Sequence, residues 1–92
     1  MLLQHKNIGN YLKKKRTLKK LTQSEVAHQL GYKSAQFISN WERGLCSPPL
    51  EAISMLIDIY GLSKTEVVEF LIEENKRVIK EGLDRHRKTK KA

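Results

Sequence analysis

Two decapeptides of this chain, LTQSEVAHQL at residues 21–30 and LSKTEVVEFL at residues 62–71, share a pattern that starts a helix. In each, a hydroxyl residue stands three positions before a glutamate, so that each side chain can bond the free backbone N–H of the other. These capping pairs are Thr22 with Glu25 and Ser63 with Glu66. Such starts, followed by apolar residues three and four apart, commit both segments to helices.

The remaining segments also favour helices over strands. No stretch alternates polar and apolar residues with period two, and glycines or prolines separate the apolar-periodic runs. We therefore predict an all-α fold of five helices, with Ser34 as the cap of the third. The helices are expected at about 5–19, between Thr22 and Gly31, between Ser34 and Gly44, at about 49–60, and from Ser63 to Gly82 or beyond. Residues Ile8, Tyr11, Leu12 and Leu18 of the first helix, and Ile53, Leu56, Ile57 and Tyr60 of the fourth, are expected to face the core.

The third predicted helix separates its side chains into two arcs at about 100° per residue. The apolar arc holds Phe37, Ile38 and Trp41, which we expect to seat the helix on the core. The opposite arc holds Gln36, Ser39, Asn40 and Arg43. An amide can pair with the N6/N7 edge of adenine and a guanidinium with the O6/N7 edge of guanine. The outer arc therefore suits the major groove of DNA, although many surface helices are polar on their outer side.

The charge of the chain points to a polyanionic partner. The 92 residues carry a formal net charge of +8, and the basic residues gather at the two ends. Residues 1–20 hold seven basic side chains and no acidic one, whereas residues 44–74 hold six acidic and one basic. Nucleic acid or an acidic membrane surface would fit this balance. The single cysteine, Cys46, and the absence of an apolar leader or spanning segment lead us to expect a cytoplasmic protein.

Particular residues in these segments resemble the Cro/lambda-repressor (XRE-like) helix-turn-helix family. The resemblance covers about residues 7–72 and rests on the segments LTQSEVAHQLG and ISNWERG together with Ile8–Gly9, Leu12, Arg16 and Pro48. It implies a five-helix lambda-repressor-like bundle whose third helix enters the major groove of double-stranded DNA. Six residues separate Gly31 from Ile38, one more than in the commonest family pattern, so the turn is longer here.

The resemblance also implies roles for individual residues. Those expected to read bases are Gln36, Asn40, Ser39 and Ala35. Those expected to contact the DNA backbone are Gln23, Lys33, Ser34 and Arg43, of which Arg43 could instead contact a base. A structural ion pair is expected between Arg16 and Glu42, joining the first helix to the end of the third.

The fifth helix continues beyond the length that the family domain needs. Its apolar pattern passes Ile72 at steps of three and four residues, and the outer part has nothing in a five-helix bundle to cover it. We therefore divide the chain into a DNA-binding domain at residues 1–72 and an extension with a basic tail at residues 73–92. The residues expected to make a homodimer are Leu71, Asn75, Val78, Ile79 and Leu83. Such a dimer reads half-sites about 34 Å apart, one turn of B-DNA.

No constellation in the sequence indicates catalysis, a cofactor or a metal. There is no glycine-rich phosphate loop or nucleophile elbow, and His5, His28 and His86 share no ligand spacing. We hypothesise a DNA-binding transcriptional repressor that is not an enzyme. One alternative is an antitoxin whose last helix holds a toxin while the same domain regulates its own gene. Another is a general binder of nucleic acid or membrane surfaces through charge alone.

Overall fold

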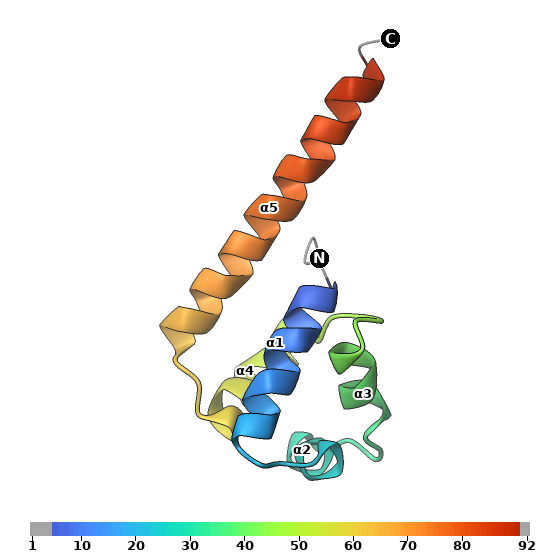
Figure 1. Ribbon diagram of the computed structural model, residues 1–92. Coiled ribbons are helices and arrows are strands. Elements are labelled where there is room, and N and C mark those ends of the chain that lie inside the picture. The colour runs from blue at the N-terminus through green and yellow to red at the C-terminus, as the bar shows by residue number, and fades with distance from the viewer. Residues whose placement is uncertain (1–4, 91–92) are drawn as a thin grey trace.

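The computed structural model describes the backbone of residues 5–90 and the side chains of residues 7–84. Within that range the chain forms five helices and no strand, which confirms the predicted all-α fold (Figure 1). The helices are α1 (His5–Leu18), α2 (Gln23–Leu30), α3 (Gln36–Glu42), α4 (Leu50–Tyr60) and α5 (Lys64–Lys90). No helix in the described range is both long and apolar enough to cross a membrane.

One core collects side chains from all five helices. In α1 the buried hydrophobic residues are Ile8 and Leu12, which lie one turn apart and belong to this core. The other buried hydrophobic residues are Val26, Ala27, Leu30, Ile38, Trp41, Ala52, Ile53, Leu56, Tyr60 and Val67. Helix α1 therefore lies at the centre of the bundle, between α3 on one side and α5 on the other (Figure 1).

Helix α2 has both ends that its sequence predicts. The Glu25 backbone N–H donates to Thr22 Oγ1 at 3.0 Å, and the Thr22 N–H donates to Glu25 Oε1 at 2.8 Å. At the other end Gly31 takes a left-handed conformation with φ of 82°, which a side chain would disfavour. The reciprocal cap and the left-handed stop fix α2 at eight residues.

Helix α5 begins with only half of the same cap. The Glu66 N–H donates to Ser63 Oγ at 3.3 Å, but the Glu66 carboxylate faces α1, where Tyr11 Oη donates to it at 3.4 Å. Lys15 Nζ also lies 3.4 Å from Glu66 Oε1. The second predicted capping box is therefore incomplete, because a tertiary contact with α1 engages the carboxylate.

Three local predictions were wrong. Leu18 is 67% exposed and Phe37 is 55% exposed, although both were expected in the core. Leu18 is the last residue of α1, where the chain turns away through Lys20 at φ of 59°. Phe37 lies at the edge of the apolar arc, where Ile38 and Trp41 already fill the contact with the core. Ser34 is not the cap residue of α3: that position is Ala35, and Ser34 Oγ accepts only from the Gln36 N–H at 3.3 Å.

Helix α5 extends well beyond the bundle (Figure 1). Its contacts with α1 involve one face of its first three turns: the Phe70 ring stacks on Tyr11 at 4.3 Å, and Asn7 Nδ2 donates to Glu74 Oε2 at 2.9 Å. The helix then continues without a break through Gly82, so this glycine does not act as a stop. We call residues 5–74 the head and residues 75–90 the distal segment.

Candidate nucleic-acid interface

The outer face of α3 carries a chain of hydrogen bonds between polar side chains. Gln36 Nε2 donates to Asn40 Oδ1 at 2.9 Å, and Arg43 Nη2 donates to the same oxygen at 3.2 Å. Gln36 and Arg43 are exposed, and Asn40 is half-buried between them. The two amides and the guanidinium predicted to touch DNA therefore form one ordered row along the helix.

This row leaves a specific set of groups for a ligand. Asn40 Oδ1 has two lone pairs, and the two donors occupy both of them. Gln36 uses one amide hydrogen on Asn40 and retains the other hydrogen and its carbonyl oxygen. A carbonyl with an amide hydrogen is the pair that recognises the N6/N7 edge of adenine. Asn40 can offer its own amide hydrogens without disturbing the row.

The other predicted contacts surround this row at different depths. Ser39 is half-buried, and Ala35 is half-buried where it packs against the core beneath the start of α3. Lys33 and Ser34 are exposed in the turn before α3. The turn therefore places one cation beside the start of the polar row, where it can neutralise a phosphate without reading sequence.

A buried carboxylate fixes α3 to the rest of the head. Glu42, whose side chain is 3% exposed, lies 2.6 Å from Arg16 Nε through Oε2, and Arg16 Nη2 donates to its Oε1 at 2.9 Å. Gln23 Nε2 donates to the same Oε1 at 2.9 Å, and Arg16 Nη1 donates to the Leu21 carbonyl oxygen at 2.7 Å. The ion pair expected from the resemblance is present, and it joins α1, the start of α2 and the end of α3.

Two groups of this network, Arg16 and the neighbouring Tyr60, have raised pKa values. The hydrogen bond to Glu42 raises the pKa of the Arg16 guanidinium above its ordinary value. Burial raises the pKa of the Tyr60 hydroxyl well above its usual range, and the Glu42 charge raises it further while Arg16 partly offsets the effect. The head therefore holds an ion pair in its interior beside a tyrosine hydroxyl that stays neutral at ordinary pH.

Gln23 has a role that its sequence position did not predict. The residue was expected at a DNA phosphate, and in the structure its amide donates to Glu42 and is half-buried. One amide hydrogen and the carbonyl oxygen of Gln23 are outside that bond. The Glu42 contact therefore orients Gln23 at the first residue of α2, and its contact with phosphate stays a prediction.

Sequence reasoning missed two features beside the polar row. Phe37 is exposed next to it, and its ring packs at 5.1 Å against Tyr32, which in turn meets Trp41 edge-on at 6.0 Å. The five-residue separation of Tyr32 and Phe37 across the long turn gave no periodic signal. Gly9 is the second feature: a Cβ added there would overlap the carbonyl oxygen of Trp41. Gly9 was among the residues that resemble the family, but the sequence did not show that its close contact with α3 requires a glycine.

The residues predicted for dimerisation fall into two groups. Leu71 packs partly against the core of its own chain, and Asn75 is half-buried with its Nδ2 donating to the Leu71 carbonyl oxygen at 3.0 Å. Val78 is half-buried, whereas Ile79 and Leu83 are 43% and 60% exposed. The two groups show that the exposed side of α5 is rotated away from Leu71.

Helix α3 follows α2 after a short turn, is fixed to the head by the Arg16–Glu42 ion pair and carries a polar outer row. This arrangement is that of a helix-turn-helix protein. The comparison with protein families agrees, because a family model described as helix-turn-helix matches residues 12–67. The chain belongs to this XRE/lambda-repressor-like helix-turn-helix family, a family of DNA-binding domains in transcription regulation that are not typically enzymatic. No curated protein and no solved structure matched the chain.

Proposed function

We propose that this protein is a cytoplasmic transcriptional repressor that binds a palindromic operator as a homodimer. In this proposal, residues 1–72 bind DNA and residues 73–92 pair with a second copy. The observation that carries the DNA-binding part is the ordered polar row of α3, mounted on a buried ion pair. The predicted homodimer is supported by the apolar side chains that the distal segment leaves exposed.

The row suggests how the predicted base readers divide their work. Gln36 pairs with one adenine through its free carbonyl oxygen and amide hydrogen. Asn40 donates to a neighbouring base and orders both Gln36 and Arg43 through its oxygen. Ser39 contributes a hydroxyl, and Ala35 a methyl contact. The predicted backbone contacts of Gln23, Lys33, Ser34 and Arg43 set the register of the head on the duplex.

Selection of binding sites from random duplex DNA tests the proposal directly. A recovered palindrome with two equal half-sites is expected, and the absence of any enriched sequence would contradict sequence reading. On the recovered site, Gln36→Ala and Asn40→Ala should each weaken binding by about 1–3 kcal/mol, the range for a good base contact. Their binding to unrelated duplex should change much less.

Matched controls separate base reading from general effects. Asn10→Ala removes an exposed amide from α1, away from the polar row, and should leave specific binding unchanged. Lys33→Ala should weaken specific and unrelated duplex alike and lower the salt dependence of binding by about one ion. Equal losses for Gln36→Ala on both duplexes would show that Gln36 does not read bases.

The exposed side of the distal segment also fits the antitoxin alternative. A different small protein, such as a toxin, would cover the same apolar residues while the head kept its DNA contacts. Sedimentation of the wild-type chain without DNA separates the two proposals. A monomer at tens of micromolar would contradict the homodimer, and stoichiometric co-purification of a second protein would then favour the antitoxin.

A further inference from the structure

Helix α5 has two apolar sides, and only one of them faces the head. Val67, Phe70 and Leu71 pack against the core or against Tyr11. A second set lies on another side and is exposed from Val68 to Leu83. We call this set the outer stripe: Val68 at 44%, Ile72 at 50%, Ile79 at 43% and Leu83 at 60% exposed. At about 100° per residue these four side chains fall within one sector of about 60°.

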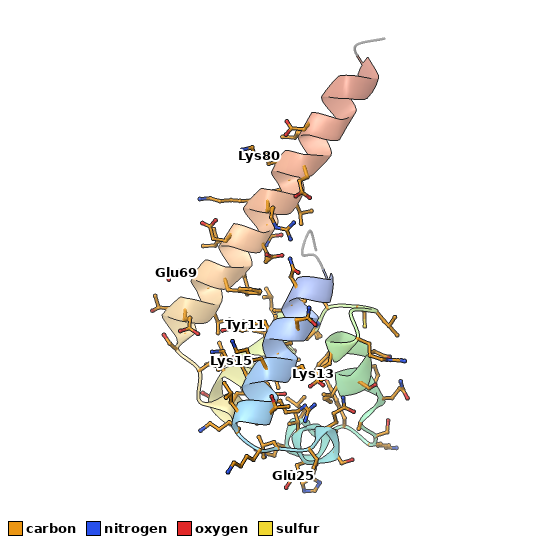
Figure 2. The ribbon with its side chains drawn as sticks, viewed as in Figure 1. Tyr11, Lys13, Lys15, Glu25, Glu69 and Lys80 are labelled. Carbon is orange, nitrogen blue, oxygen red and sulfur yellow. The ribbon has the colours of Figure 1, made fainter. Side chains whose placement is uncertain are left out.

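Charged side chains of opposite sign border the outer stripe at its two ends. Glu69 and Glu73 lie beside its first half, and Lys76 and Lys80 beside its second. Figure 2 shows Glu69 and Lys80 projecting from the same side of α5, the side turned away from α1. Glu73 and Lys76 are 3.6 Å apart within the helix, whereas Glu69 and Lys80 have no ion pair among the described residues. The border is thus acidic first and basic second.

This polarity decides how two copies can pair. The charged border lies on one flank of α5, and in a parallel two-fold pair that flank faces the opposite flank of the partner helix, so Glu69 of one copy cannot reach Lys80 of the other. In an antiparallel pair the acidic half of one copy meets the basic half of the other. We propose that α5 pairs antiparallel with α5 of a second copy of this chain. The inference rests on the proposed homodimer and adds its direction and register.

The apolar residues define the register. Val68 and Leu83 are equally distant in sequence from the midpoint between Asn75 and Lys76, and so are Ile72 and Ile79. A two-fold axis at that midpoint places Val68 against Leu83 of the second copy and Ile72 against Ile79 of the second copy. Glu69 then lies level with residue 82 of the second copy, about two residues from Lys80. The same register therefore pairs the apolar residues of the outer stripe and brings the opposite charges of its border close together.

A groove in the head continues the outer stripe at the first turn of α5. It has a volume of about 340 Å³ between α4 and α5, and Leu50, Ile53, Val68 and Asp58 are among its lining residues. Leu50 is 65% exposed at this groove. The antiparallel register directs the end of the second α5 toward this groove.

The pairing leaves the DNA-binding face open. Helix α1 lies between α5 and α3, so a second copy on the far side of α5 does not approach the polar row (Figure 1). Association through α5 and DNA binding through α3 are therefore separate events that can be measured separately.

Disulfide cross-linking tests the direction. In a Cys46→Ser background, which removes the exposed native thiol, one chain carries Val68→Cys and another, with a longer tag, carries Leu83→Cys. A disulfide requires Cα atoms within about 7 Å, so the antiparallel register predicts the mixed 68–83 dimer as the product under mild oxidation. Dimers linked 68–68 and 83–83 would overturn the antiparallel direction. A chain that gives no cross-link and sediments as a monomer would overturn the pairing itself.

Charge reversal tests the border. Glu69→Lys and Lys80→Glu should each weaken self-association about tenfold, since each replaces two attractive contacts per dimer with repulsive ones. The double variant Glu69→Lys/Lys80→Glu should return to within about threefold of wild type. Lys14→Glu, an exposed position on α1 with the same charge change as Lys80→Glu, should have no effect. A double variant no better than the single ones would overturn the Glu69–Lys80 contact.

The same variants keep this inference distinct from the proposed function. Each is titrated on an isolated half-site and on unrelated duplex. Loss of cross-linking with preserved half-site specificity contradicts the α5 pairing alone. A mixed dimer that fails to distinguish the half-site from unrelated duplex supports the pairing and contradicts the proposed base reading.

Discussion

The head and the distal segment are both helical, yet they are helical for different reasons. In the head, each helix buries one apolar side against its neighbours, as Ile8 and Leu12 of α1 and Val67 of α5 do. In the distal segment Ile79 and Leu83 remain exposed, and ion pairs within the helix lie on its surface, such as Arg77 with Glu74 at 2.9 Å and with Glu81 at 3.2 Å. Pairs of this kind contribute about 0.3–0.5 kcal/mol each. The head is thus held by packing, whereas the distal segment extends a helix that the head has already nucleated.

Trp41→Ala should produce the largest loss on the head side of this comparison. Trp41 is 3% exposed beneath α3, and truncating such a side chain costs about 3–5 kcal/mol. That is a large share of the stability of a small domain, so the midpoint of urea denaturation followed by circular dichroism should fall sharply. DNA binding should be lost together with the fold. A variant of wild-type stability would contradict the packing of α3 described above.

Tyr60 should make the head sensitive to alkali. Its pKa is raised in the folded state and is about 10 in the unfolded chain, so below pH 10 the hydroxyl is neutral in both states. Above pH 10 the unfolded state loses the proton first, and the free energy of unfolding should fall by about 1.4 kcal/mol per pH unit.

Tyr60→Phe removes this titration and isolates its effect. Denaturation at about pH 9 and about pH 11 should give a smaller loss for the variant than for wild type. Parallel losses in the two proteins would show that Tyr60 ionises as readily in the folded state as in the unfolded one.

The two helix starts give a finer comparison. Thr22→Ala removes a reciprocal cap with bonds of 2.8 and 3.0 Å and should cost about 1 kcal/mol. Ser63→Ala removes one bond of 3.3 Å and should cost less than half as much, because the Glu66 contacts with α1 remain. Equal losses in thermal denaturation would indicate that the contact with α1 adds nothing to the start of α5.

Ile79→Gln should have the smallest effect on the folding of the head. Its side chain lies in the distal segment, so the free energy of unfolding of the monomer should change by no more than about 0.5 kcal/mol. Self-association measured by sedimentation should nevertheless weaken. The same substitution at Ile53, which is 4% exposed in α4, should unfold the head. A comparable destabilisation by Ile79→Gln would remove the distinction between the two regions.

The features predicted best from the sequence were helix ends, which residues close together in the sequence determine. Thr22, Glu25 and Gly31 fix α2 through bonds and dihedral angles within a few positions, and all three acted as expected. Gly82 did not stop α5, because a glycine ends a helix only where the chain must turn. The same reasoning gave the helix bounds to within one or two residues at most ends.

The burial and the contacts of side chains, which depend on the adjoining helices, were predicted less well. Phe37 and Leu18 have helical phases compatible with burial, but the phase does not show how wide an arc the adjoining helices cover. The polar row of Gln36, Asn40 and Arg43 followed from the wheel, whereas its hydrogen bonds and the Gln23–Glu42 contact needed the tertiary arrangement. The contacts of these residues with DNA stay predictions.

The tight crossing of α1 and α3 at Gly9 has a consequence for genetics. A methyl group at this position would meet the backbone carbonyl oxygen of Trp41, an atom that no rotamer change can move aside. The end of α3 would have to shift, and with it the side chains one turn earlier. A mutagenesis screen for loss of DNA binding should therefore recover substitutions of Gly9, a buried residue of α1 on a different helix from the polar row. Second-site suppressors should be sought first among the larger side chains of the α1–α3 contact, where a smaller residue can restore the distance between the two helices.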